Sequence, residues 1–394
     1  MSDNRPFAIV TDGLWRKSVC AIRSLGRAGF RVIVLGNSSF TTGFYSRYTA
    51  MRFKGPTAAE DHDGFGNVLH RALTATKESP AAILPMEDAS CQWLLANASH
   101  LPHHAKFLLP DGASFSVASD KVRTAALAEQ CGIPCPKYFA PENASALSDF
   151  VRGNNIENLV LKPRRGSGSS GIVYGPKIRS IDFEHHWDKY GELLLQERVP
   201  SEGKAFGVSL LYDSTGIHVA SFEHRRLRQY PISGGPSTQR VSVALGELTS
   251  LSRRLLENLK WRGVAMVEWK YDPRSGTPLL LEVNPRFWGS LALAVNAGVD
   301  FPTLYANAAL GKPLSHSLSA YQVGTMSRWL IPGDILRYYN ESPGAREPLC
   351  QFLRGIIRDS EEFDSGDVLG SLASCICTGM LALNPRYWKY VRKR

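Results

Sequence analysis

The sequence predicts an α/β protein in which an N-terminal parallel sheet is followed by antiparallel strands. The first observation is that residues 7–35 show a strand, a helix and a second strand, an opening typical of a parallel sheet. The second is that residues 264–284 hold two apolar strands joined by a Pro-Arg-Ser-Gly turn, which predicts a hairpin. At 394 residues the chain exceeds the size at which one core usually keeps growing, so we expect several domains.

The N-terminal elements are expected as a strand over residues 7–10, a helix over 16–28 and strands over 31–35 and 82–86. A dinucleotide site would need Gly-x-Gly-x-x-Gly after the first strand, but the chain reads Thr-Asp-Gly-Leu-Trp there, which disfavours an oxidoreductase. Glu87 and Asp88 follow the last of these strands, at the edge where open parallel sheets bind ligands. We interpret them first as partners of a helix dipole.

A capped helix marks the expected change of domain. Ser119 or Asp120 can cap a helix that runs to about Gln130. From Leu159 onward the sequence changes to strands and Gly-rich turns. We therefore expect domains over residues 1–116, 117–192 and 193–315, followed by a helical extension over 316–394.

Composition is that of an ordinary globular protein, with 43% hydrophobic and 21% charged residues. The net charge of +10 is spread along the chain without a nucleic-acid motif, so we expect anionic small molecules and no nucleic acid as partners. The seven cysteines lack metal-site spacing and indicate free thiols in a reducing cytoplasm. The polar N-terminus is not followed by the apolar stretch of a signal peptide.

The hairpin carries the strongest chemical signal. Glu282, Asn284 and Arg286 stand at alternate positions, so they share one face of a strand. A hairpin centred near Ser275 would place Glu268 across from Glu282, and facing carboxylates repel each other unless a cation lies between them. Oxygen ligands in small number fit Mg²⁺ that keeps waters and binds nucleotide phosphates. A surface hairpin with solvated acids is the alternative.

A Gly-rich segment follows a strand that ends in Lys162. It holds Gly166, Ser167, Gly168, Ser169 and Gly171, whose backbone amides can approach phosphates. The lysine precedes the glycines and Gly-Lys-Ser/Thr is missing, so this is not a Walker A loop. A plain Gly-Ser hairpin is the alternative.

Two further segments suit nucleotide and carboxylate recognition. A strand over residues 193–196 leads into Glu197, Arg198 and Val199, where backbone groups can bind an adenine edge and a nearby acid can accept from ribose hydroxyls. Arg226 and Arg228 precede a Gly-Gly-Pro-Ser-Thr loop, a combination suited to carboxylate or phosphate oxygens. A solvated basic strand would show the same pattern.

Taken together, the order and spacing of these segments resemble the ATP-grasp superfamily of carboxylate ligases. The resemblance covers about residues 7–315 and rests on Lys121, Lys162 with its Gly-rich loop, residues 196–199, Glu268 and the set Glu282-x-Asn284-x-Arg286. Residues 224–228, 233–238 and 284–290 look like the predicted ATP-dependent carboligase branch. The resemblance implies an N-terminal parallel α/β pre-ATP-grasp domain followed by a two-lobed ATP-grasp fold with antiparallel sheets.

The resemblance also implies roles for these residues. Lys121 and Lys162 would hold ATP phosphates, and residues 166–171 would cover them. Glu197, Arg198 and Val199 would line the adenine site. Several ATP-grasp ligases have the ribose acid seven residues beyond the hinge glutamate, where this chain has Lys204, so Glu202 is the substitute. Glu268, Glu282 and Asn284 would bind Mg²⁺, with Mn²⁺ as a substitute metal, and Arg286 would stabilise charge on the transferring phosphoryl group.

The implied activity joins a small-molecule carboxylate to an amine through an acyl phosphate, with release of ADP and phosphate. Arg226 and Arg228 would contact the carboxylate or the acyl phosphate. A small-molecule kinase and a non-catalytic ATP-binding protein are the alternatives. A homodimer is expected because it is the commonest oligomer. The apolar stretch 368–383 and the basic aromatic residues after it favour a helix packed on the body, with contact to a membrane surface as the less favoured alternative.

Overall fold

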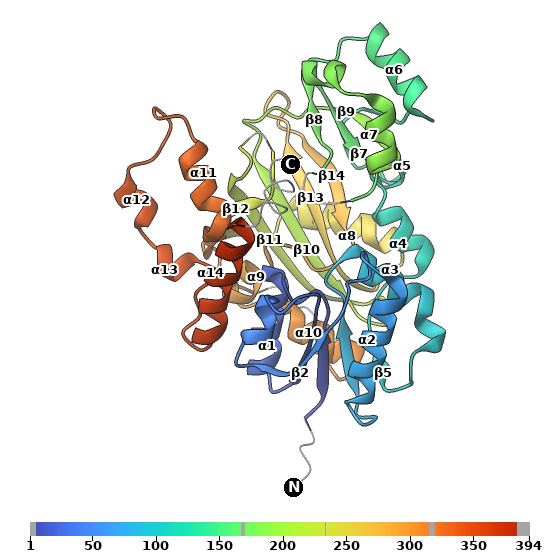
Figure 1. The fold of residues 1–394 in the computed structure, drawn as a ribbon. Coiled ribbons are helices and arrows are strands. Elements are labelled where there is room, and N and C mark those ends of the chain that lie inside the picture. Colours follow the sequence, from blue (N-terminus) through green and yellow to red (C-terminus); the bar gives the residue numbers. More distant parts are fainter. Residues whose placement is uncertain (1–4, 167–169, 233, 315–319, 384–394) are drawn as a thin grey trace.

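Three β-sheets organise the chain (Figure 1). The computed structural model describes residues 5–166, 170–232, 234–314 and 320–383. One sheet is parallel and the other two are antiparallel, so the predicted α/β class is confirmed.

The parallel sheet has the strand order β3-β2-β1-β4-β5. Its strands are β1 (Phe7–Val10), β2 (Arg31–Gly36), β3 (Thr49–Lys54), β4 (Ala81–Leu84) and β5 (Ala105–Lys106). The helices of this part are α1 (Arg16–Arg27), α2 (His62–Thr74) and α3 (Asp88–Asn97), with the short helices η1 (Thr42–Tyr45) and η2 (Ala98–His100). Every residue of β1 and β4 is buried, as expected for central strands covered on both faces.

The core of the parallel sheet continues into a distant part of the chain. Helices α9 (Leu291–Ala297) and α10 (Phe301–Ala309) lie beside α1, and α10 also contacts β4 (Figure 1). One hydrophobic cluster therefore includes Val10 and Leu84 from the sheet together with Trp288 and Phe301. The N-terminal sheet and the segment after residue 284 thus bury their apolar side chains against each other.

The smaller antiparallel sheet has the order β6-β9-β7-β8. It consists of β6 (Tyr138–Phe139), β7 (Leu159–Pro163), β8 (Val173–Tyr174) and β9 (Leu193–Glu197), with α6 (Ala144–Gly153), α7 (Phe183–Tyr190) and η3 (Gly175–Ser180). Helices α4 (Gly112–Ala118) and α5 (Lys121–Gln130) precede it. The predicted cap is confirmed, because the Asp120 side chain accepts from the backbone N–H groups of Val122 and Arg123 at the start of α5.

The larger antiparallel sheet has the order β14-β13-β10-β11-β12-β15. Its strands are β10 (Ala205–Tyr212), β11 (His218–Gln229), β12 (Ser237–Val243), β13 (Gly263–Tyr271), β14 (Pro278–Asn284) and β15 (Met326–Arg328), with α8 (Glu247–Asn258). The predicted hairpin is β13–β14, and Glu268 is paired with Glu282 as expected. The register shifts after this pair, because Trp269 is paired with Leu280, so Leu281 is an extra residue on β14.

The last part of the chain forms η4 (Leu330–Asp334), α11 (Ile335–Asn340), α12 (Leu349–Leu353), α13 (Ile356–Asp359) and α14 (Val368–Leu383). β15 pairs with β12, so the first part of the expected helical extension is a strand of the larger sheet. Buried Asp334 ties the extension to that sheet by accepting from Arg228, Arg328 and Arg337. None of the helices in the described ranges is long and apolar enough to cross a membrane. The expected domain boundaries stay a prediction.

Candidate active site

A single cavity of about 840 Å³ lies where the two antiparallel sheets, the N-terminal segment and the C-terminal extension meet. Its walls include Lys162 from β7, Glu197 from β9, Arg226 from β11, Glu268 from β13 and Glu282 from β14. These residues come from segments up to 120 positions apart. The structure therefore brings most of the predicted site residues into one space.

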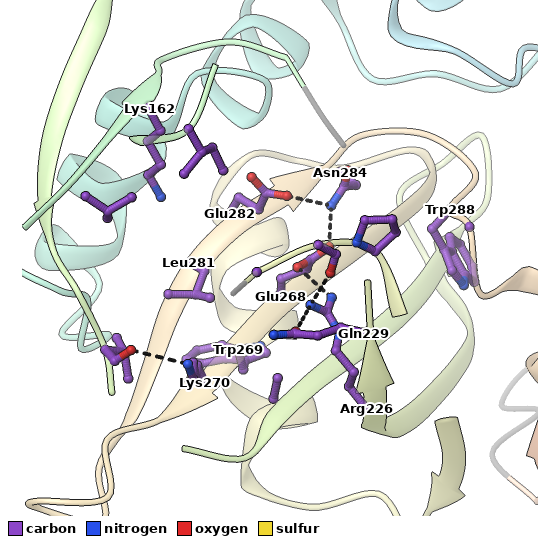
Figure 2. Close-up of a pocket in the computed structure, with 18 of the residues that line it drawn as sticks. Lys162, Arg226, Gln229, Glu268, Trp269, Lys270, Leu281, Glu282, Asn284 and Trp288 are labelled. Atoms are coloured by element: carbon purple, nitrogen blue, oxygen red, sulfur yellow. Dashed lines mark hydrogen bonds and ion pairs between the residues drawn. The ribbon is translucent and has the colours of Figure 1, made fainter. Parts of the chain in front are cut away.

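Glu268 and Glu282 stand on neighbouring strands and share a neighbour (Figure 2). The Asn284 amide nitrogen donates to Glu268 Oε1 at 3.3 Å and to Glu282 Oε1 at 3.4 Å. Burial and the adjacent charge of Glu282 raise the pKa of Glu268. Burial alone would also raise the pKa of Glu282, but Lys121 and Lys162 reverse this and hold it below its ordinary value.

Each of the two carboxylates has a cation beside it. Lys121 is the first residue of α5, and its Nζ lies 3.3 Å from Glu282 Oε2. Arg226 extends from β11, and its NH2 lies 3.3 Å from Glu268 Oε2. Arg226 also donates from NH1 to the Gly235 carbonyl at 3.1 Å, so the loop after β11 helps to fix it. Each acid of the pair therefore has one positively charged neighbour.

Lys162 points into the same cavity from the smaller sheet (Figure 2). Its side chain is only 8% exposed, and no hydrogen bond or short ion pair joins its Nζ to another described residue. Burial and the neighbouring Lys121 lower the pKa of Lys162 to about 8. A buried ammonium that donates no hydrogen bond to another described residue is well suited to bind an anion.

Arg286 is nearly buried at the end of β14 and connects the hairpin to the parallel sheet. Its Nε donates to Asp88 Oδ2 at 3.1 Å and its NH1 to the Phe287 carbonyl at 2.9 Å. Its NH2 donates to Asn284 Oδ1 at 3.3 Å. The oxygen of Asn284 thus faces Arg286 while its nitrogen faces the two acids, and the amide must turn before that oxygen can face a cation held between them.

The residues present fit a magnesium ion that takes most of its ligands from water and phosphate. The described residues hold no cluster of three or more His, Cys, Asp or Glu side chains that could bind a metal by themselves. Two facing carboxylates and one amide are instead the partial oxygen set expected for Mg²⁺ in a nucleotide site. Burial and the charge of Glu282 raise the pKa of Glu268, so a cation between the two carboxylates would favour the ionised form of Glu268.

The predicted adenine segment also lines the cavity. Glu197 accepts from Arg274 NH2 at 2.7 Å, and the Val199 carbonyl accepts from Lys270 Nζ at 3.2 Å. The Arg198 guanidinium lies over the Tyr174 ring, 5.1 Å from its centroid. Glu202 is exposed and also lines the cavity, so the acid proposed for the ribose is within the site.

The Gly-rich segment joins β7 to β8 beside these residues. Gly166 and Gly171 have φ values of +106° and +73°, and a Cβ on Gly171 would lie 2.9 Å from the Pro163 ring. Lys121 Nζ donates to the Gly166 carbonyl at 2.9 Å, which attaches the start of this segment to the acidic pair. Ser167, Gly168 and Ser169, also predicted to cover phosphates, lie outside the described residues.

Arg228 lines the cavity but is already paired with the C-terminal extension. Its NH1 lies 3.2 Å from Asp334 Oδ2 and its NH2 lies 2.6 Å from Glu347 Oε2. Arg226 and Arg228 were expected to act together, but Arg226 faces the acidic pair while Arg228 is held by two carboxylates of the extension. Arg228 is therefore less available than Arg226 to a substrate carboxylate.

Two parts of the wall were not predicted as site residues. Lys17, 6% exposed on α1, lies 2.8 Å from Glu87 and donates to the Phe287 carbonyl at 3.1 Å. Glu87 makes no side-chain cap on α3, and both it and Asp88 have cationic partners, so their interpretation as dipole partners alone was incomplete. Their position at the carboxyl end of a parallel strand was the available signal. Arg337 and Glu341 of the extension also line the cavity, and no motif marks them.

Comparison with known proteins identifies this arrangement. Residues 224–328 match the family described as "ATP-grasp in the biosynthetic pathway with Ter operon", a segment that holds Arg226, Glu268, Glu282, Asn284 and Arg286. The chain has the ATP-grasp fold, and this segment matches an ATP-grasp family. This confirms the predicted resemblance and the predicted ATP-grasp fold.

Solved structures share this ATP-grasp fold at low sequence identity. The biotin carboxylase domain dimer of a 2-oxoglutarate carboxylase from Hydrogenobacter thermophilus, with MgADP and bicarbonate, has a TM-score of 0.64 and 15% identity over 81% of this chain and 73% of that chain. An L-amino acid ligase from Bacillus licheniformis has a TM-score of 0.58 and 17% identity over 78% of this chain and 74% of that chain.

A curated relative is acetyl-CoA carboxylase 1 of Oryza sativa subsp. japonica, which is 24% identical over 208 residues. The match covers 46% of this chain and 9% of that protein. The chain thus spans about a tenth of the length of the curated relatives that it matches.

Proposed function

We propose that the protein is an ADP-forming ligase that joins a carboxylate to an amine through an acyl phosphate. The observation that carries this proposal is the pair Glu268 and Glu282, which face each other in a cavity that also holds Lys162, Arg226 and Arg286. The similar structure with MgADP and bicarbonate and the similar L-amino acid ligase support it.

The chemistry explains why such a site needs ATP. At neutral pH a carboxylate and an amine form a salt and not an amide, because hydroxide is a poor leaving group. In the first step a carboxylate oxygen bonds to the γ-phosphorus, the bond from that phosphorus to the bridging oxygen breaks, and ADP leaves. In the second step the amine attacks the acyl carbon, phosphate leaves with the carboxylate oxygen, and the nitrogen loses a proton.

The chain's own residues would orient the reactants and balance charge. Glu268, Glu282 and, after its amide turns, Asn284 would hold Mg²⁺, which when bound supplies positive charge to the phosphate oxygens. Mn²⁺ is the expected substitute metal. Lys121 and Lys162 would bind phosphate oxygens from the side of the smaller sheet.

Arg226 and Arg286 would stabilise the transferring phosphoryl group from the side of the larger sheet. Arg226 lies beside Glu268, and the position of Arg286 is fixed by Asp88. No nucleophilic side chain is required, because the reaction depends on positioning and on charge neutralisation.

The adenine segment completes the nucleotide site. Glu197, Arg198 and Val199 would line the base, and Glu202 would accept from the ribose hydroxyls. The Gly166–Gly171 segment would cover the phosphates, since its glycines permit a close approach of backbone N–H groups. Arg228 would reach a substrate carboxylate only by exchanging its present carboxylate partners.

The test is a screen of carboxylates crossed with amines, read by ADP release and by product mass. An active carboxylate incubated with ATP and hydroxylamine should yield a hydroxamate, because hydroxylamine captures an acyl phosphate. A stable phosphorylated product without hydroxamate would identify a kinase instead. ATP binding without ADP release for any pair would support a non-catalytic ATP-binding protein.

The cellular setting follows the same proposal. All seven cysteines are free thiols, as the sequence predicted. We expect the enzyme to act in the cytoplasm, where ATP and reducing conditions coexist. A homodimer is expected, and the similar biotin carboxylase domain is a dimer.

A further inference from the structure

The C-terminal extension carries most of the large apolar side chains that the described residues expose. Ten of the seventeen such side chains lie between Tyr339 and Met380. Five of them form a continuous stripe on α14, here called the α14 apolar face: Val368, Leu369, Leu372, Ile376 and Met380, which are between 44% and 67% exposed. The spacing of three and four residues places them on one side of the helix.

The opposite side of α14 is packed on the protein, as the sequence predicted. Ala373 and Cys377 are buried, and the helix contacts η1 and η4. Asp367, just before the helix, accepts from Arg23 Nε at 2.9 Å, from Ser46 Oγ at 2.8 Å and from the Arg47 backbone N–H at 2.8 Å. The helix is therefore held in one orientation that leaves the α14 apolar face outward.

The sequence that follows α14 is strongly basic and aromatic. Residues 384–394 contain five Lys or Arg, three aromatic residues and no Asp or Glu. Their positions lie outside the described residues, but they are joined directly to the end of the helix. An outward apolar helix face and an adjoining segment with a charge of +5 therefore occur together at one end of the chain.

We propose that the α14 apolar face and the basic segment after it bind the enzyme to the surface of an anionic lipid bilayer. The apolar face would enter the boundary between headgroups and acyl chains, and each basic residue near an anionic surface contributes about 1 kcal/mol. Burial of the apolar face and electrostatic attraction of the basic segment are two separate contributions. Stable attachment to a membrane surface generally needs two such contributions. The helix lies on the surface and does not cross it.

Charge favours a lipid surface over a second copy of this chain. A contact between two α14 apolar faces would bury the apolar side chains but would bring no anionic surface to the segment of charge +5, which contains no Asp or Glu. Anionic headgroups would meet the apolar face and attract the basic segment at the same time. Because salt screens the attraction between basic residues and anionic headgroups, binding of the protein to the vesicles should weaken as the salt concentration is raised.

The experiment is vesicle flotation with the full-length chain. Vesicles of phosphatidylcholine alone are compared with vesicles that contain about 30% phosphatidylglycerol. The protein should float with the anionic vesicles only, and the double variant Leu372→Glu with Ile376→Glu should lower the floated fraction at least about tenfold. Ile217→Glu is the matched control, because Ile217 is 53% exposed in the β10–β11 turn.

A second variant tests the basic segment without touching the helix. Lys389→Gln with Arg392→Gln should weaken flotation and reduce its salt dependence, while the thermal unfolding midpoint stays that of the unaltered chain. The proposal is overturned if the unaltered chain does not float, if it floats equally with neutral vesicles, or if the helix variant floats as well as the control. A dimer in solution that the helix variant dissociates, without flotation, would assign the face to a second copy.

Discussion

Arg286 Nε donates to Asp88 Oδ2 at 3.1 Å, although 198 positions separate the two residues. Asp88 begins α3 at the carboxyl end of β4, and Arg286 follows β14. This ion pair joins the parallel sheet to the acidic pair of the hairpin. The charge of Asp88 and the burial of the Arg286 guanidinium together hold the positive charge of Arg286 at one place in the cavity.

Replacing Asp88 with Asn should lower kcat for ADP release by about tenfold to a hundredfold, because a hydrogen bond to a charged group contributes about 1.5–3 kcal/mol. The KM for ATP should change much less, since Asp88 positions Arg286 and does not contact phosphate. Asp149→Asn is the matched control, as Asp149 is exposed and pairs with exposed Arg152 on α6. An unchanged kcat in the Asp88 variant would contradict the role of this ion pair.

Glu268 and Glu282 should respond differently to neutralisation even though both are proposed metal ligands. Glu282→Gln and Glu268→Gln should each lower ADP release more than about a hundredfold, as should chelation of Mg²⁺. Without ligand, Glu282→Gln should lower the unfolding midpoint, because Lys121 and Lys162 then lack their counter-charge. Glu268→Gln should not, because the raised pKa shows that its ionised form is disfavoured.

Measurements of ADP release and of thermal unfolding on both variants separate these effects. The exposed Glu257 on α8 provides a Glu→Gln control that should change neither. ADP release that survives either substitution in the hairpin would show that the metal assignment is wrong.

Lys162 should give the reaction an alkaline limit. Its pKa is lowered to about 8, so the charged form that binds phosphate is present below that pH and is lost above it. kcat/KM for ATP should therefore fall about tenfold per pH unit above pH 8, since this quantity reports the free enzyme. In Lys162→Arg the guanidinium stays charged, and the decline should move to higher pH. The same alkaline decline in Lys162→Arg would assign it to another group.

Asp367 should be important for stability and not for chemistry. It is fully buried, and it accepts from Arg23, Ser46 and the Arg47 backbone, so Asp367→Asn should lower the free energy of unfolding by about 3 kcal/mol. Hydrogen bonds, with the help of Arg23, hold the pKa of Asp367 below its ordinary value against the effect of burial. This stability is therefore present at neutral pH and is lost as the pH falls through that lowered pKa.

Urea unfolding of the Asp367 variant at neutral pH checks this expectation, with Asp149→Asn again as the exposed control. Equal unfolding midpoints for the two variants would show that Asp367 does not anchor the extension.

The parts of the site that the sequence predicts are those set by local rules. The pairing of Glu268 with Glu282 follows from strand alternation and from the short turn between them, and the Asp120 cap follows from the helix start. The contact between Arg286 and Asp88 could not be predicted, because either residue alone also suits a solvated surface. Only the packing of α9 and α10 on the parallel sheet brings them together.

The residues that the C-terminal extension adds to the cavity wall could not be predicted either, because they too depend on tertiary packing. Asp334 accepts from Arg228, Arg328 and Arg337, and the sequence contains many arginines that could have been its partners. Tertiary packing selects these three, and with them it places Arg337 and Glu341 in the wall of the cavity. No periodicity or spacing carries that information.

The core shared by β1, β2, β4, α9 and α10 has a practical consequence for anyone dividing this protein into pieces. A fragment that starts near residue 117 would present Trp288, Phe301 and Tyr305 to water, and the complementary fragment would do the same with Val10 and Leu84. Each piece alone should aggregate, whereas the two pieces produced together in one cell should associate. The expected domain boundary near residue 117 is therefore a poor place to cut the chain.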